Sequence, residues 1–376
     1  MEYRNYRNTG LKTSLLGFGC MRFPMLEDGK TIDKALTEKM VDLAYASGVN
    51  YFDTAYVYNG GESERTIGAI LKKYPRESFF LTSKMPNFMC KCEADVARIF
   101  NESLERCGVE YFDFYLCHNV NGGNIDFYTG ENYVIPYLEK MKAEGRIRYL
   151  GFSSHGKPEE LQRMVNVRDW DFAQIQFNYL DWTYQDAEAQ YAILEKAGLP
   201  IMVMEPIRGG RLASLGDMGK KLEEYAPGKS AASWALRWAA THPAIQVVLS
   251  GMSSFEQVQD NLATFADFKP MTEPENAILA ETAQAILSDA LIPCTGCRYC
   301  SVCPQELDIP NLLKIYGDYL LSRNAFSLSS LGQLPEDKKP SNCLGCGACA
   351  ERCPQNIEIP KLLAELADLA AKQPRR

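Results

Sequence analysis

Eight of the chain's thirteen cysteines are crowded near its carboxyl end, between residues 294 and 353. They form two runs in which neighbouring cysteines are separated by only two or three residues: Cys294, Cys297, Cys300 and Cys303, then Cys343, Cys346, Cys349 and Cys353. Thiolates at this spacing can converge from one tight loop, and they are strong ligands of iron and zinc. The sequence therefore predicts metal centres held by eight cysteines.

The two runs belong to an internal repeat. Segment 294–320 matches segment 343–369 in its cysteines, in a Cys-Pro and an Ile-Pro step, and in a following apolar helix. The second run resembles the bacterial ferredoxin pattern C-x₂-C-x₂-C-x₃-C-P, whereas the first is one residue shorter before Cys303. This resemblance implies two [4Fe–4S] clusters in which the last cysteine of each run ligates the other cluster: Cys294, Cys297, Cys300 and Cys353 on one, Cys343, Cys346, Cys349 and Cys303 on the other. Zinc is the alternative, because C-x₂-C pairs also build tetrahedral zinc sites, but the duplicated Cys-Pro step favours iron.

Charge and apolar patterning disfavour some classes of partner and some cellular locations. The net charge of −8 disfavours nucleic acid as a partner. No apolar run is long enough for a signal peptide core or a membrane span, so we expect a cytoplasmic protein without a membrane partner. In that compartment the remaining five cysteines are expected to be small buried apolar side chains: Cys20, Cys90, Cys92, Cys107 and Cys117.

Short β-rich runs alternate with amphipathic helical patterns through the first part of the chain. This alternation predicts parallel strands with helical crossovers, and eight such units predict an α/β fold, a closed (β/α)₈ barrel. A doubly wound open sheet is the rival, but no glycine-rich G-x-G-x-x-G follows the first run. The predicted strands are 15–20, 51–55, 79–85, 111–118, 148–154, 172–178, 200–206 and 245–251.

The domain boundaries follow from the same patterns. We predict a barrel over 1–265, a linker with one helix over 266–292, and a small, mainly helical two-cluster domain over 293–376. The stretch 322–342 between the two repeats is polar and is predicted to be a loop. His242, in a Thr-His-Pro step, is predicted to be a surface cap at a helix end.

Four residues with chemically useful side chains fall at or just beyond the carboxyl ends of predicted strands, where barrels carry their chemistry. Asp53 and Tyr58 follow the second strand, Lys84 lies at the end of the third, and His118 ends the fourth. Here the sequence resembles the aldo-keto reductase superfamily from about residue 10 to 265, through D-T-A-x-x-Y, S-K-x-P and D-x-Y-L-x-H. The resemblance implies reduction of a carbonyl or oxidation of an alcohol.

The roles implied for these four residues are physically sound. A carbonyl that receives hydride builds negative charge on its oxygen, and Tyr58 would protonate it. The ammonium of Lys84 would stabilise the tyrosinate and lower the pKa of the hydroxyl. Asp53 would hold Lys84, and His118 would orient the carbonyl oxygen.

The same resemblance implies a nicotinamide nucleotide as cofactor. NADP(H) is expected, with NAD(H) left open because Gln257 stands where many relatives have an arginine, and Met204 stands where many have a stacking aromatic. The implied contacts are Ser153, Ser154 and Gln176 to the nicotinamide, Pro206 and Arg208 to the pyrophosphate, and Ser250, Gly251, Ser253, Gln257, Asp260 and Asn261 to the adenosine end.

How the two parts work together is less constrained by sequence. Hydride carries two electrons, whereas a cluster passes one at a time. The chain is expected to act on a small carbonyl or alcohol, with clusters that relay electrons, for example to a ferredoxin-type partner, or that order the carboxyl-terminal region. The alternative is a nucleotide-binding electron-transfer or sensor protein.

Overall fold

The computed structural model covers the chain and describes all residues except 291, 293, 295–299, 323–324, 354–356 and 373–376. It divides into two compact units. The first comprises Met1–Leu215 and Lys220–Leu279, and the second comprises Gly216–Gly219 and Ala280–Arg376. Within the described residues no helix is both long and apolar enough to cross a membrane.

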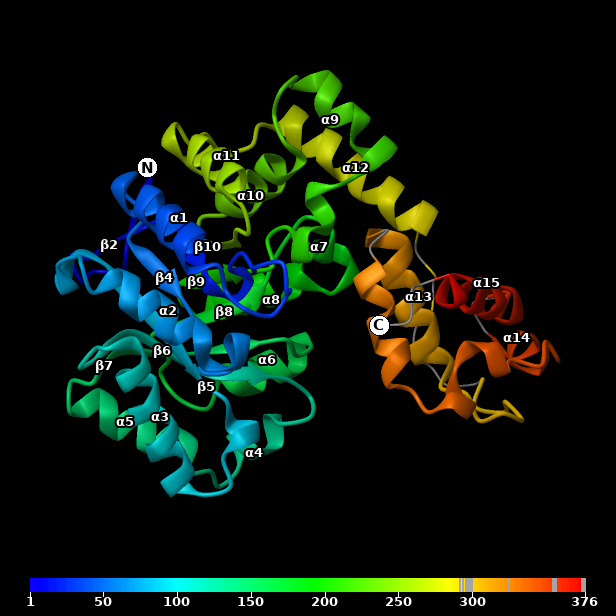
Figure 1. Cartoon of the computed structure of the whole chain (residues 1–376), viewed down its shortest axis with the longest axis horizontal. Coiled ribbons are helices and arrows are strands. Elements are labelled where there is room, and N and C mark those ends of the chain that lie inside the picture. Colours follow the sequence, from blue (N-terminus) through cyan, green and yellow to red (C-terminus); the bar gives the residue numbers. More distant parts are fainter. Residues whose placement is uncertain (291, 293, 295–299, 323–324, 354–356, 373–376) are drawn as a thin grey trace. The chain divides into compact units, whose positions relative to one another are not determined.

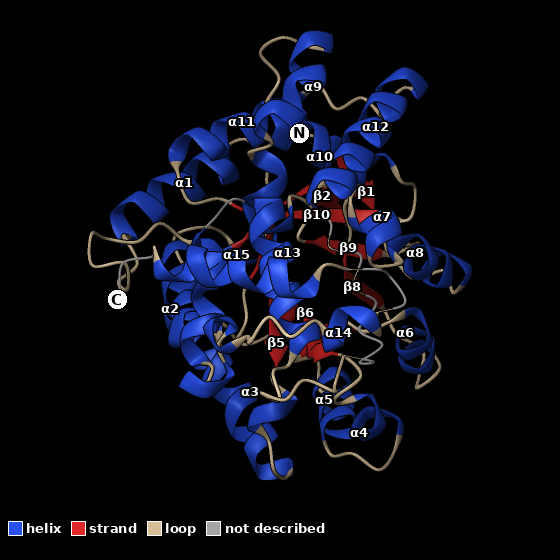
Figure 2. Cartoon of the chain, turned by 90° about the vertical axis from the view of Figure 1, so that its right-hand side faces the viewer, coloured by secondary structure: helices blue, strands red, loops and turns tan. Residues whose placement is uncertain are grey.

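The first unit is a closed eight-stranded barrel, which confirms the predicted fold class. All its strands pair in parallel, and the first barrel strand closes on the last. Figures 1 and 2 show these strands enclosed by helices. The strands are β3 (Leu16–Gly19), β4 (Tyr51–Asp53), β5 (Phe80–Met85), β6 (Phe112–Val120), β7 (Ile147–Ser154), β8 (Phe172–Gln176), β9 (Ile201–Met204) and β10 (Ile245–Gly251).

Helices follow the strands at the positions that the apolar periodicity indicates. Asp33, Ser230 and Ser254 cap helix starts through side-chain bonds to backbone N–H groups. Gly108 ends another helix in the left-handed conformation, φ +65°, that glycine tolerates best. The helices are α1 (Lys34–Ala46), α2 (Glu62–Leu71), α3 (Glu93–Cys107), α4 (Ile125–Thr129), α5 (Val134–Ala143), α6 (Pro158–Val165), α7 (Asp181–Tyr184), α8 (Ala187–Lys196), α9 (Lys220–Tyr225), α10 (Ala231–Thr241), α11 (Phe255–Ala266) and α12 (Glu273–Ala290).

The sequence did not reveal the short antiparallel hairpin that precedes the barrel, β1 (Tyr3–Asn5) with β2 (Lys12–Ser14). Tyr6, in the hairpin turn, is fully buried. Its ring packs edge-on against Phe114, with centroids 5.2 Å apart, and its hydroxyl donates to the carbonyl of Asp171. Its other neighbours lie near the amino ends of the strands, so the hairpin seals the floor of the barrel.

His242 shows where the sequence interpretation was wrong in part. It is the C-cap of α10, as predicted, but its ring is not on the surface. The ring is half-buried and packs among four aromatic rings, the nearest being Trp238 at 4.5 Å between centroids; the other three are Phe177, Trp182 and Tyr191. Burial lowers the pKa of His242, so the ring acts as part of an apolar cluster.

An ion pair joins α10 to the start of α12. Arg237 donates from both terminal nitrogens to the Glu275 carboxylate, at 2.8 and 3.1 Å, and the backbone and hydroxyl of Thr272 donate to the same group. Burial favours the neutral acid, but these hydrogen bonds outweigh it and hold the pKa of Glu275 at about 2.

A pH-dependent contribution to stability follows from this pair. A depressed carboxyl pKa stabilises the fold above the ordinary value of 4.5, and the contribution is lost as pH falls towards 2. We expect Glu275→Gln to lower the free energy of unfolding by about 1–2 kcal/mol near neutrality, after allowance for solvent screening. This difference should shrink below pH 4.5 in urea titrations. The exposed neighbour Glu273→Gln should show neither effect; an equal loss at every pH would contradict the assignment.

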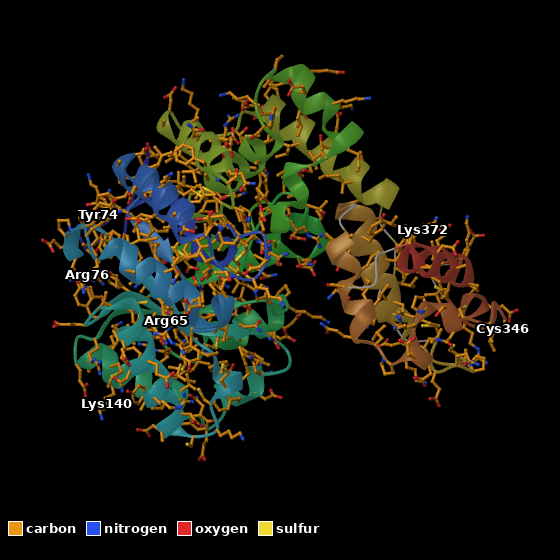
Figure 3. All side chains as sticks on the ribbon, viewed as in Figure 1. Arg65, Tyr74, Arg76, Lys140, Cys346 and Lys372 are labelled. Carbon is orange, nitrogen blue, oxygen red and sulfur yellow. The ribbon has the colours of Figure 1, made fainter. Side chains whose placement is uncertain are left out.

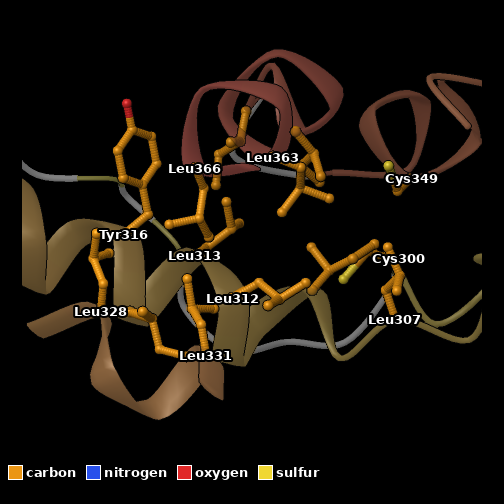
Figure 4. Packing of buried hydrophobic residues seen from close by; sticks show 14 residues of the cluster. Cys300, Leu307, Leu312, Leu313, Tyr316, Leu328, Leu331, Cys349, Leu363 and Leu366 are labelled. Carbon is orange, nitrogen blue, oxygen red and sulfur yellow. The ribbon is translucent and has the colours of Figure 1, made fainter. Parts of the chain in front are cut away.

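The second unit is mainly helical and is built around α13 (Ile309–Ser322) and α15 (Ile359–Ala371), with α14 (Ala348–Glu351) between them in sequence. Figure 4 shows leucines of α13 and α15 pointing towards one another, with Cys300 and Cys349 at one end of the cluster. The residues of this core come from both repeats, so each repeat needs the other to bury its apolar face.

The polar stretch 322–342 is not the plain loop that its composition predicts. It contains three 3₁₀ helices: Ala325–Gln333, Glu336–Lys338 and Pro340–Asn342. Leu328 and Leu331 are 5% exposed and belong to the core of the unit. Two serines separate these leucines and a glycine follows them, so no clear apolar periodicity marks the stretch.

Candidate active site and cysteine cavity

Four side chains meet at the carboxyl ends of neighbouring barrel strands. Asp53 ends β4, Lys84 lies at the end of β5, and His118 lies near the end of β6. Tyr58 begins an irregular turn, Tyr58–Gly61, between β4 and α2, with left-handed backbone at Asn59 and Gly60. Parallel strands bring these ends to one face, so the four residues singled out by sequence come together in space.

Lys84 is the buried centre of this group. Its ammonium donates to Asp53 at 2.5 Å and to the carbonyl of Thr54 at 2.7 Å, and it lies 4.8 Å from the ring centroid of Tyr58. Both members of the ion pair have side chains at most 5% exposed. Burial disfavours the ammonium, but the charge of Asp53 and the neighbouring Tyr58 outweigh it and raise the pKa of Lys84. Lys84 is therefore a fixed positive charge.

Tyr58 stays protonated in this setting. Burial raises the pKa of its hydroxyl above 10, and the charge of Lys84 opposes that rise. The lowering expected from Lys84 is thus present, but burial is the larger effect in the protein alone. A phenol held beside an ammonium can release its proton when a nearby oxygen becomes basic, because the ammonium stabilises the resulting anion.

His118 faces the same point. Its ring lies edge-on to that of Tyr58, with centroids 5.9 Å apart, and 6.4 Å from the ring of Phe88. Burial, together with the charges of Lys84 and His155, lowers the pKa of His118 to about 3. The imidazole is therefore neutral near neutral pH, and it can donate one hydrogen bond.

The neutrality of His118 can be tested directly. A depressed pKa means that the neutral form persists until the pH approaches 3, so we expect its ring carbon and nitrogen resonances to stay constant between pH 8 and pH 5. Histidine-labelled protein would show this by NMR, with His118→Gln used to assign the signal. A titration of that signal centred near pH 6.5, the ordinary value, would contradict it.

The residues expected at the nicotinamide lie at the ends of the next two strands. Ser153 accepts a bond from the backbone of Asn119 at 2.9 Å, and Ser154 accepts one from Gly156. The side-chain nitrogen of Gln176 donates to Asp181 at 2.6 Å and to Gln185 at 3.3 Å, which leaves its carbonyl oxygen as an acceptor.

Asp181 was not found by sequence reasoning. Its side chain is fully buried, accepts from Gln176 and Asn178 at 2.6 Å, and pairs with Arg208 at 3.1 Å. Gln176 and Asn178 lie just before it in sequence, but its charged partner, Arg208, comes from the loop after β9, so nothing in the sequence distinguishes this acid. It links the predicted nicotinamide contact to the predicted pyrophosphate loop.

The half-buried Met204 ends β9, and the buried Pro206 lies in the loop that follows. Its backbone is left-handed at Glu205, Arg208, Gly209 and Gly210. Arg208 is 7% exposed, and its Nη1 atom has no hydrogen-bond acceptor among the described residues. A buried guanidinium with a donor to spare fits an anionic ligand such as a nucleotide phosphate.

The segment expected at the adenosine end largely satisfies its own polar groups. Asn261 donates to Ser250, Ser230 donates to Asp260, and the side chain of Gln257 accepts from the backbone of Ser253. Gln257 is exposed. These contacts shape the turn after β10 and leave Ser253 and Gln257 at its surface.

Arg22 is a further cation that sequence reasoning passed over. It pairs with Glu205 at 3.4 Å, and its backbone carbonyl accepts from the hydroxyl of Ser253. A Cβ built on Gly251 would lie 3.3 Å from its side-chain carbons. Arg22 therefore lies between the two segments expected to hold the nucleotide. Its position just after the first barrel strand, where barrels carry their chemistry, could have marked it in the sequence.

In the second unit, four of the predicted cluster ligands surround one hollow. Cys303, Cys343, Cys346 and Cys349 line a space of about 320 Å³, counted with the solvent at its mouth. The remaining wall is mostly apolar: Pro304, Gln305, Ile309, Leu344, Gly347, Pro360 and Leu363. Cys346 is exposed and stands on the outside of the unit (Figure 3). This is the set expected for one cluster, including the crossover of Cys303.

Four thiols around one hollow are a donor set that suits a metal cluster. Among the described residues, no three histidine, cysteine or acidic side chains lie close enough together to hold a single metal ion. Of the other predicted set, Cys294, Cys300 and Cys353 pack on the same core, while Cys297 lies outside the described residues. The five cysteines of the barrel are buried as expected except Cys92, which is exposed.

Sequence comparisons match both units to known families. Residues 15–284 match the aldo/keto reductase family, and residues 293–358 match the 4Fe-4S dicluster domain. Similar proteins include L-galactose dehydrogenase of Arabidopsis thaliana, 28% identical across 72% of this chain and 90% of that protein. Another is the NADH-specific methylglyoxal reductase of Escherichia coli, 22% identical across 68% of this chain and 90% of that protein.

Solved structures agree with these matches. The holo form of an aldo-keto reductase from Bacillus halodurans superimposes with a TM-score of 0.63 and 26% identity. The alignment covers 76% of this chain and 97% of that protein.

Proposed function

This chain belongs to the aldo/keto reductase family and carries a 4Fe-4S ferredoxin-like domain, and we propose that it reduces the carbonyl group of a small molecule with hydride from a nicotinamide nucleotide. The predicted family membership and its assignment as an oxidoreductase are confirmed. The observation that carries the proposal is the buried pair of Lys84 and Asp53 beside Tyr58. A protein that only bound nucleotide would have no use for a buried ammonium next to a phenol.

The chemistry follows from the placement of these groups. A bound reduced nicotinamide supplies hydride to the carbonyl carbon. As the carbonyl oxygen gains charge, Tyr58 gives it a proton, and Lys84 stabilises the tyrosinate until solvent returns the proton. Neutral His118 donates a hydrogen bond to the same oxygen and fixes its position.

The nucleotide would be held by three groups of residues. Ser153 and the free carbonyl oxygen of Gln176 suit the two ends of a carboxamide, and Arg208 and Arg22 suit phosphates. Segment 250–262 contains Glu256 and Asp260 and no lysine or arginine, so selection of NADP(H) over NAD(H) would depend on cations outside it.

For the second unit we propose two [4Fe–4S] clusters that pass single electrons to or from a soluble carrier protein. One cluster would be held by the thiols around the described hollow. Its mouth is bordered by exposed Cys346 and by Leu344, which is 65% exposed. An exposed edge suits exchange with a partner, because electron transfer weakens steeply with distance. Reduced thiol ligands also favour the cytoplasm as the location.

One anaerobic experiment tests both parts. The purified protein is given NADPH or NADH with a panel of aldehydes and ketones, and nucleotide oxidation, alcohol formation and cluster absorption are followed together. We expect one alcohol for each nucleotide oxidised during turnover. One further nucleotide per protein should be oxidised without forming alcohol, because its two electrons reduce the two clusters and bleach their band. If no carbonyl compound is consumed, the reductase proposal fails. If the cluster band stays unchanged both during turnover and after addition of a reduced carrier protein, the electron relay fails.

A further inference from the structure

Arg106 of α3 contacts the loop that carries Tyr58 on both sides of that residue. Its Nη1 atom donates to the backbone carbonyl of Tyr56 at 3.1 Å, and its guanidinium lies 4.0 Å from the centroid of the Tyr56 ring. On the other side, a Cβ built on Gly61 would lie only 2.7 Å from Nη1. The loop is therefore bent around the guanidinium, with Tyr58 between the two contacts.

Gly61 is needed at this bend for two reasons. Its φ of +92° follows two other left-handed residues, Asn59 and Gly60. A side chain there would be strained and would also displace the guanidinium. The conformation of the loop and the position of Arg106 thus depend on each other.

Glu64 connects Arg106 and the loop bent around it to β5, the strand that carries Lys84. It lies in the first turn of α2, and its side chain has no solvent exposure. One carboxylate oxygen is 3.3 Å from Nη1 of Arg106, and the other accepts from the hydroxyl of Ser83 at 2.6 Å. Since Ser83 precedes Lys84 on β5, one carboxylate ties the Tyr58 loop to the strand that carries its ammonium partner.

The contacts of the guanidinium at position 106 require an arginine. Arg106 is 15% exposed and also pairs with Glu102, which accepts a 2.5 Å bond from the hydroxyl of Tyr56. Its planar group serves two carboxylates, one carbonyl and one aromatic ring at once. A lysine ammonium is a point charge and cannot make all these contacts.

We infer that Arg106 and Glu64 are positioning residues that set the placement of the Tyr58 hydroxyl relative to the Lys84 ammonium, and so the rate of proton delivery to the carbonyl oxygen. The inference rests on the proposed function, since it concerns the proton that Tyr58 would deliver. Arg106 and Glu64 are called positioning residues because they act through Tyr58. A displacement of about 1 Å at a reacting group can cost about a hundredfold in rate. The effect should therefore appear in kcat and leave substrate binding nearly unchanged.

The test compares Arg106→Lys and the milder Ser83→Ala with Arg65→Lys, an exposed arginine of α2 labelled in Figure 3. We expect kcat to fall about 10- to 100-fold for Arg106→Lys and about threefold for Ser83→Ala, with KM and nucleotide affinity within about twofold of the parent. Arg65→Lys should behave as the parent does. Thermal unfolding and iron content, measured on every sample, correct for any unfolded fraction, and Ser83→Ala keeps the test informative if Arg106→Lys folds poorly.

The pH dependence separates positioning from a general loss of structure. Lys84 opposes the rise in the pKa of Tyr58, so a looser loop should move the alkaline limb of the kcat profile to higher pH. Unfolding alone would scale the profile without moving it. If the parent turns over and Tyr58→Phe does not, but Arg106→Lys and Ser83→Ala keep the parental kcat and pH profile, the positioning inference is wrong while the reductase proposal stands. If the parent reduces no carbonyl compound, both are wrong.

Discussion

Replacing Tyr58 with phenylalanine is expected to lower kcat by about a thousandfold, the range typical of a lost general acid. The ring would still pack beside His118 and Lys84, so substrate binding and folding should change little. Only the proton that neutralises the developing oxyanion is removed. Lys84 could not replace it efficiently, because Asp53 and the carbonyl of Thr54 hold two of its three N–H groups and the raised pKa of Lys84 makes its ammonium a weak acid.

The measurement is nucleotide-dependent reduction of the best aldehyde found for the parent, with the cluster absorption recorded on the same sample. Tyr225→Phe is the matched control, since that side chain is 47% exposed and lies on α9, where its ring packs against Trp234 of α10. Retention of more than a tenth of the parental kcat by Tyr58→Phe would exclude Tyr58 as the proton donor.

The second large effect concerns the cysteines, where Cys303→Ala is expected to remove the same cluster as Cys346→Ala. Both side chains line the hollow with Cys343 and Cys349, although Cys303 belongs to the other run in sequence. Each variant should lose about half of the iron of the parent, and the two should lose the same EPR signal. The physical reason is that a cubane held by four thiolates is destabilised when one ligand is replaced by a methyl group.

Cys300→Ala provides the contrast, because it is expected to remove the other signal. Cys92→Ala, at an exposed cysteine of the barrel, should leave iron and EPR spectra unchanged. If Cys303→Ala loses the same EPR signal as Cys300→Ala, each cluster is held by cysteines of one run only. If none of these variants loses iron, the eight cysteines are not cluster ligands.

The features that sequence could predict are those encoded over short distances. Asp53, Tyr58, Lys84 and His118 lie at strand ends, and apolar runs mark those strands. The pairing of Arg106 with Glu64 could not be predicted, because it depends on the side-by-side packing of α2 and α3. At that contact a Cβ on Gly68 would lie 2.3 Å from the carbonyl oxygen of Cys107.

Other differences have equally local causes. His242 has the sequence of a surface cap, but Phe177, Trp182 and Tyr191 enclose its ring together with Trp238 of its own helix. Leu328 was hidden in a polar stretch and is held by the core between the repeats. In both cases part of the environment comes from residues far away in sequence, such as Phe177 for His242 and Leu363 for the core around Leu328, and periodicity carries no information about them.

The closure of the barrel floor by Tyr6 has a consequence for the kinetics. With the floor closed by aromatic packing, the proposed nucleotide and carbonyl compound would have to enter and leave at the opposite end. A nucleotide stretched across that entrance and a carbonyl compound above it would have to arrive in a fixed order and depart in reverse. Product-inhibition patterns should therefore be those of a compulsory-order mechanism, with oxidised nucleotide competing directly with its reduced form.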